Sequence, residues 1–158
     1  MEVLELTSPS PSYTRRLGTR LGDLAQPGDV YLLMGQLGSG KTCLVQGIAW
    51  GMGISGFVAS ASFVLVAEHH GRLPLYHIDL YRIEETAQVS DLGLEEYVYG
   101  AGVCAVEWAD QAISLFPRER LEVYLDYAGE RRRRLRFQGV GERYRGLLDA
   151  LAVWVRSQ

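Results

Sequence analysis

The segment Gly35 to Thr42 reads GQLGSGKT, and it constrains the fold of this chain more than any other feature. It matches the pattern G-x-x-x-x-G-K-[ST] in full; the apolar run Val30 to Met34 comes before it and a helical stretch from about Lys41 to Met52 comes after it. In that order of strand, loop and helix, backbone amides and the positive end of the helix hold phosphate groups. The segment therefore predicts a phosphate-binding loop, called the P-loop below.

The residue types of the P-loop suit a nucleotide triphosphate and its metal ion. Lys41 is the single lysine of a chain that carries fifteen arginines, so the one compact ammonium stands where β- and γ-phosphates are expected. The Thr42 hydroxyl is the expected protein ligand of Mg²⁺. We therefore expect ATP and Mg²⁺ as cofactors. The residues expected to contact the nucleotide are Gly35, Leu37, Gly38, Ser39, Gly40, Lys41 and Thr42.

Length and composition favour a folded cytoplasmic protein. The 158 residues are about one domain's worth of chain, so we expect a single P-loop ATPase domain over 1–158. A net charge of −3 argues against a surface that binds nucleic acid by itself. The first ten residues lack the basic and then apolar pattern of a signal peptide, and no apolar run approaches the length of about 20 residues that spans a membrane.

Hydrophobic periodicity along the chain predicts an α/β fold. The short apolar runs without alternation are typical of buried parallel strands, and the alternating segments 121–127 and 131–137 predict a hairpin. Expected strands lie at 3–6, 30–34, 63–68, 75–81, 103–106, 121–127 and 131–137, and expected helices start at Ser10 or Ser12 and lie at 41–52, within 84–99 and at 142–156. This is a P-loop NTPase-type sandwich: a mixed sheet, with a parallel core plus antiparallel hairpins, flanked by helices.

Two carboxylates stand at the ends of apolar runs. Asp79 follows Leu75 to Ile78, and Glu107 follows Val103 to Val106. A P-loop enzyme needs such a group to hold Mg²⁺ or to orient the attacking water. A helix cap or a surface ion pair is the alternative for each. Between its apolar neighbours, His77 is expected to be structural.

With these motifs in order, the chain resembles the TsaE (YjeE) family, the ATPases of bacterial tRNA threonylcarbamoyladenosine biosynthesis. The resemblance extends from Thr14 to Tyr144, and it rests on GQLGSGKT together with SASF at 60–63, HIDLYR at 77–82 and VEWAD at 106–110. It implies that Thr42 and Glu107 bind Mg²⁺ and that Asp79 is needed for hydrolysis. With Lys41, these two carboxylates form the expected catalytic set.

The resemblance also implies partners and a switch. Family members act with two proteins, TsaB-like and TsaD-like, of the tRNA threonylcarbamoyl transferase complex, and hydrolysis is expected to reset that complex. Contact with tRNA would then be indirect, through the complex. The SASF segment is similar to the family's switch-like Ser-Pro-Thr-Phe segment, with Ala61 in place of proline and Ser62 in place of threonine. Trp108 is expected to pack in the core or to lie near the nucleotide.

Two other functions share the P-loop. A small-molecule kinase would add an arginine-rich lid, which Arg131 to Arg134 could supply. That segment alternates like a strand, so two of its four arginines could reach ATP or a partner surface. We expect instead a solvated edge strand and assign none of the four to the site. A GTP-dependent switch would need an Asn-Lys-x-Asp motif, which is impossible because Lys41 is the single lysine. The D-x-x-G match at Asp126 to Gly129 is expected to be a turn.

Overall fold

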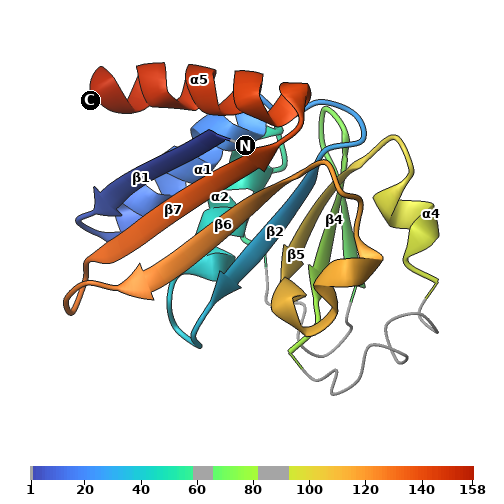
Figure 1. Cartoon of the computed structure of the whole chain (residues 1–158), viewed down its shortest axis with the longest axis horizontal. Helices are drawn as coiled ribbons and strands as arrows, with labels where there is room; N and C mark the ends of the chain where they lie inside the picture. Colours follow the sequence, from blue (N-terminus) through green and yellow to red (C-terminus); the bar gives the residue numbers. More distant parts are fainter. Residues whose placement is uncertain (1, 59–65, 82–92) are drawn as a thin grey trace.

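All strands of the computed structural model join one mixed sheet within the described residues, which are 2–58, 66–81 and 93–158 (Figure 1). The sheet has seven strands in the order β1-β7-β6-β2-β5-β4-β3. The strands are β1 (Glu2–Ser8), β2 (Val30–Gly35), β3 (Val66–His70), β4 (Pro74–Asp79), β5 (Val103–Glu107), β6 (Arg120–Tyr127) and β7 (Arg133–Val140). The helices are α1 (Pro11–Asp23), α2 (Lys41–Gly51), α4 (Glu95–Val98), the 3₁₀ segment η1 (Ala109–Leu115) and α5 (Glu142–Arg156).

The centre of the sheet is parallel and its flanks are antiparallel, as the sequence predicts. Strand β2 lies between β5 and β6 and is parallel to both, and β4 is parallel to β5. The β3–β4 and β6–β7 pairs are antiparallel hairpins. The α/β fold with a parallel core and antiparallel hairpins is therefore confirmed.

Several predicted boundaries shift. Strand β7 begins at Arg133 and not at Arg131, because Ala128 donates to the Arg132 carbonyl and closes a turn there. The prediction of an edge strand at this segment is wrong, since β1 pairs with β7 on its other side. Residues 63–65 of one predicted strand and 84–92 of the predicted helices lie outside the described residues, while α4 falls within that helical prediction.

Helices cover both faces of the sheet. Helices α1, α2 and α5 bury their apolar residues in one core with β2, β6 and β7, whereas α4 and η1 cover the other face over β4 and β5 (Figure 1). Ser10 caps α1 by accepting a hydrogen bond from the Tyr13 amide at 3.2 Å. Close contact of α1 with α2 requires Gly47, where a Cβ atom would lie 2.1 Å from the Arg15 carbonyl oxygen. Helix α2 and the P-loop before it are thus fixed against α1.

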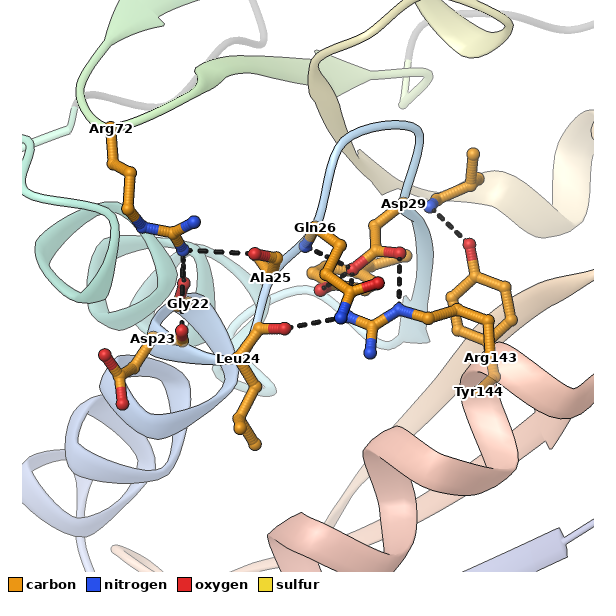
Figure 2. A network of polar contacts seen from close by, with 11 residues as sticks. Gly22, Asp23, Leu24, Ala25, Gln26, Asp29, Arg72, Arg143 and Tyr144 are labelled. Atoms are coloured by element: carbon orange, nitrogen blue, oxygen red, sulfur yellow. Dashed lines mark hydrogen bonds and ion pairs between the residues drawn. The ribbon is translucent and has the colours of Figure 1, made fainter.

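A buried carboxylate fixes the start of β2 (Figure 2). Asp29, only 2% exposed, accepts hydrogen bonds from the Gln26 amide at 2.9 Å and from the Tyr31 hydroxyl at 2.7 Å. Arg143 of α5 donates to both of its oxygens, at 2.9 and 2.7 Å. The Tyr144 hydroxyl oxygen accepts a hydrogen bond from the Val30 N–H at 2.9 Å, so α5 is joined to the first residue of the strand that leads to the P-loop.

The carboxyl ends of the parallel strands meet at one edge of the sheet. Strand β2 ends in the P-loop, and its Leu33 is the register partner of Glu107 on β5. Glu107 is in turn the register partner of Asp79 on β4. Among the described residues, no helix is both long and apolar enough to cross a membrane.

Candidate functional site

The P-loop wraps around the start of α2. The Ser39 amide donates to the Gln36 carbonyl at 3.0 Å, and Gly38 and Gly40 have φ values of 78° and 107°. Residues with side chains rarely adopt these left-handed conformations, so the two glycines allow the loop to turn directly into the helix. The Ser39 hydroxyl is buried and has no hydrogen-bond partner within the described part of the chain. A buried hydroxyl of this kind fits a loop that accommodates a polar ligand.

Lys41 lies inside the loop. Its side-chain ammonium donates to the carbonyl oxygens of Gly35 at 2.5 Å and Gln36 at 2.9 Å. Burial lowers the pKa of Lys41, and the negative charge of Glu107 is the largest of the effects that oppose this lowering. The Lys41 ammonium thus lies where the loop would surround a phosphate group.

Thr42 and Glu107 meet, as their predicted shared role requires. The Thr42 hydroxyl donates to the Glu107 carboxylate and lies 3.2 Å from each oxygen. In an octahedral Mg²⁺ shell with ligand distances near 2.1 Å, neighbouring oxygens lie about 3 Å apart. The hydroxyl and one carboxylate oxygen therefore fit two adjacent positions around such an ion.

Asp79 is buried beside Glu107 at the same sheet edge. Only 2% of Asp79 is exposed, and its Oδ1 accepts a hydrogen bond from the Tyr81 amide at 2.9 Å. As register partners on parallel strands, Asp79 and Glu107 project from the same face of the sheet. The bond from the Tyr81 amide caps the turn after β4 and leaves Asp79 beside Glu107.

His77 holds the Glu107 carboxylate, a contact that the sequence analysis missed. Its Nε2 lies 2.5 Å from Oε2 of Glu107, and the imidazole is fully buried. The expected structural role of His77 is therefore to hold the Glu107 carboxylate in place. The signal was present in the sequence, because His77 precedes Asp79 by two residues and so projects from the same face of β4.

Trp108 packs against an aromatic side chain and lies beside Lys41. Its ring packs against Tyr81 with centroids 4.9 Å apart, and the Lys41 ammonium lies 3.9 Å from its ring centroid. Among described residues other than glycine, it alone has a positive φ, of 59°. Trp108 also lines a cavity of about 350 Å³ beside the P-loop, together with Asp110.

The remaining sequence motifs fall into two groups. The SASF segment at 60–63 and Arg82 of HIDLYR lie outside the described residues. The arginine run 131–134 forms a turn and the start of an interior strand, in which Arg134 is the register partner of both Asp126 on β6 and Thr7 on β1. Because this segment is part of the sheet, the arginine-rich lid of a small-molecule kinase finds no support in it.

Comparisons with known proteins agree with this geometry. A profile of the family described as "Threonylcarbamoyl adenosine biosynthesis protein TsaE" matches residues 8–135. The tRNA threonylcarbamoyladenosine biosynthesis protein TsaE of Bacillus subtilis is 41% identical over 96% of both chains, and that of Treponema pallidum is 42% identical over 77% of this chain and 90% of its own. The crystal structure of Bacillus subtilis YdiB superposes with a TM-score of 0.84 at 38% identity and covers 96% of this chain and 95% of its own. This chain therefore belongs to the TsaE family of tRNA threonylcarbamoyladenosine biosynthesis proteins.

Proposed function

We propose that this chain binds ATP with Mg²⁺ at the P-loop and hydrolyses it to ADP and phosphate. The observation that carries the proposal is the convergence of Lys41 and Thr42, the first two residues of α2, with Glu107 at the end of β5. An ammonium inside a P-loop, a hydroxyl at the helix start and a carboxylate opposite it are the groups that a magnesium–nucleotide complex requires.

Each residue has a distinct role in this proposal. Lys41 neutralises charge on the β- and γ-phosphates, while Thr42 and Glu107 would hold Mg²⁺. When bound, Mg²⁺ withdraws negative charge from the phosphate oxygens. Asp79 orients the attacking water and accepts a hydrogen bond from it as the bond to the γ-phosphorus forms. The P-loop residues Gly35, Leu37, Gly38, Ser39 and Gly40 would surround the phosphates.

The hydrolysis step is proposed to serve a partner complex in the cytoplasm. Membership of the TsaE family places the chain in tRNA threonylcarbamoyladenosine biosynthesis. We propose that the chain is one domain that acts with TsaB-like and TsaD-like proteins and resets them between turnovers. Its net charge of −3 supports contact with tRNA only through that complex.

The test is ATP hydrolysis, measured for the chain alone and then with both partner proteins and tRNA. Lys41→Ala should weaken ATP binding and abolish hydrolysis. Thr42→Val has a similar volume but lacks the ligand hydroxyl, so it should fold normally and lose Mg²⁺ dependence. Unchanged hydrolysis by Lys41→Ala would refute the proposal. Phosphate transfer to a small-molecule acceptor instead of water would favour the kinase alternative.

A further inference from the structure

Two side chains of the β6–β7 hairpin reach the P-loop from far along the chain. The Tyr127 hydroxyl donates to the backbone carbonyl oxygen of Leu37. Arg133 donates from Nη2 to the next carbonyl oxygen, that of Gly38, at 3.3 Å. Both contacts therefore fall on consecutive carbonyl groups in the exposed part of the P-loop.

Tyr127 and Arg133, which make these contacts, also contact each other. Tyr127 and Arg133 are register partners at the end of the hairpin, and the guanidinium carbon lies 4.5 Å from the tyrosine ring centroid. Arg133 also donates from Nη1 to carbonyl oxygens of the connecting turn, among them that of Gly129 at 3.1 Å. The guanidinium is thus held by the turn and by the ring before it reaches the P-loop.

The fit between the hairpin and the P-loop is close. A Cβ atom on Gly38 would lie 2.8 Å from the Tyr127 hydroxyl oxygen. Tyr127 therefore approaches the loop at a point where only glycine leaves room, and the left-handed conformation of Gly38 brings its carbonyl group to Arg133.

These contacts set the direction of loop amides. In a trans peptide the C=O of one residue and the N–H of the next point in opposite directions within one rigid plane. A hydrogen bond to the Leu37 carbonyl therefore turns the Gly38 N–H away from Tyr127. The bond to the Gly38 carbonyl fixes the plane of the Ser39 N–H in the same way, and that N–H donates to the Gln36 carbonyl within the turn.

We propose that Tyr127 and Arg133 are positioning residues that hold the P-loop in its phosphate-binding shape. The inference rests on the proposed function, because it matters only if the loop binds a nucleotide. P-loop amides surround the α- and β-phosphates, which ATP and ADP share. Loss of either contact should therefore weaken both nucleotides equally and leave the rate at saturation unchanged.

The test compares Tyr127→Phe and Arg133→Gln with Arg131→Gln. Tyr127→Phe removes only the hydroxyl and keeps the ring under Arg133. Arg131 is exposed in the same turn, so Arg131→Gln makes the same charge change without a contact to the P-loop. Affinities for ADP and ATP are measured with a fluorescent nucleotide analogue, hydrolysis is measured at saturating ATP, and Tm confirms folding.

We expect Tyr127→Phe and Arg133→Gln each to weaken both nucleotides about 2- to 10-fold, the range for one net hydrogen bond, while Arg131→Gln matches the wild type. Wild-type affinities in the first two variants would overturn the inference. An equal loss of affinity in Arg131→Gln would overturn the inference, because the effect would then come from charge alone. A loss of affinity for ATP but not for ADP would also overturn it, because the effect would then come from contact with the γ-phosphate. Failure of the wild type to bind either nucleotide would instead refute the proposed function.

Discussion

The Asp29 network offers a stability test that is separate from the nucleotide site. In Asp29→Asn one carboxylate oxygen becomes an NH₂ group, and three of the four donors converge on Oδ2 while only Arg143 Nε faces Oδ1. The amide should therefore place its NH₂ at the Oδ1 position. The variant then keeps the three contacts at Oδ2, loses the charge-assisted hydrogen bond from Arg143 Nε, and leaves Arg143 without an opposite charge.

The expected cost follows from these losses. A hydrogen bond to a charged group contributes about 1.5–3 kcal/mol, and removal of one partner of a buried ion pair costs about 3–5 kcal/mol. Because 27% of the Arg143 side chain is exposed, water recovers part of that loss. We expect the free energy of unfolding to fall by about 2–4 kcal/mol, a large share of the roughly 5–15 kcal/mol typical of a domain.

Asp23→Asn is the matched control. It makes the same charge change, and it breaks an ion pair with Arg20 whose side chains are 34% and 62% exposed. Such a surface pair contributes at most about 1 kcal/mol. Urea unfolding, followed by circular dichroism, gives both free energies by linear extrapolation. The reasoning is refuted if Asp29→Asn lowers the free energy of unfolding no more than Asp23→Asn does. ADP affinity should be unchanged in both variants, because Asp29 lies before the first residue of β2 and the P-loop lies at the other end of that strand.

Three further predictions concern the site and the core. Asp79→Asn and Glu107→Gln should each bind ATP yet hydrolyse it on the order of 10²-fold more slowly, with a double variant little worse than the poorer single one; near-normal hydrolysis in either would make that carboxylate structural. His77→Gln should raise the Mg²⁺ concentration for half-maximal hydrolysis by about 10-fold or more, whereas His70→Gln, which changes an exposed side chain, should not. Equal Mg²⁺ titrations for the two variants would contradict this prediction. Burial raises the pKa of Cys104 from 9.0 to about 12, so the folded state retains a proton that the unfolded chain releases. The free energy of unfolding should therefore fall as the pH rises above about 9. Urea unfolding between pH 8 and 11 measures this slope, and a constant free energy would contradict the prediction.

The parts of the fold that the sequence predicts well are those encoded locally. The P-loop is eight consecutive residues, and β2 and α2 follow from the apolar run and the periodicity on either side of it. The β6–β7 hairpin follows from two alternating segments and a turn. Alternation does not say which strand pairs with which, so the position of β7 inside the sheet depended on β1, a segment more than a hundred residues away.

The site shows the same division between local and distant information. Asp79 and Glu107 were candidates because each ends an apolar run, but a one-residue slip between β4 and β5 would turn one of them to the opposite face of the sheet. Register therefore decides whether they form one cluster. The contacts of Tyr127 and Arg133 with the P-loop join residues 90 and 95 positions apart and leave no periodic signal. Four identical arginines thus include one, Arg133, that contacts the P-loop, because the turn places it at the start of β7 opposite Tyr127.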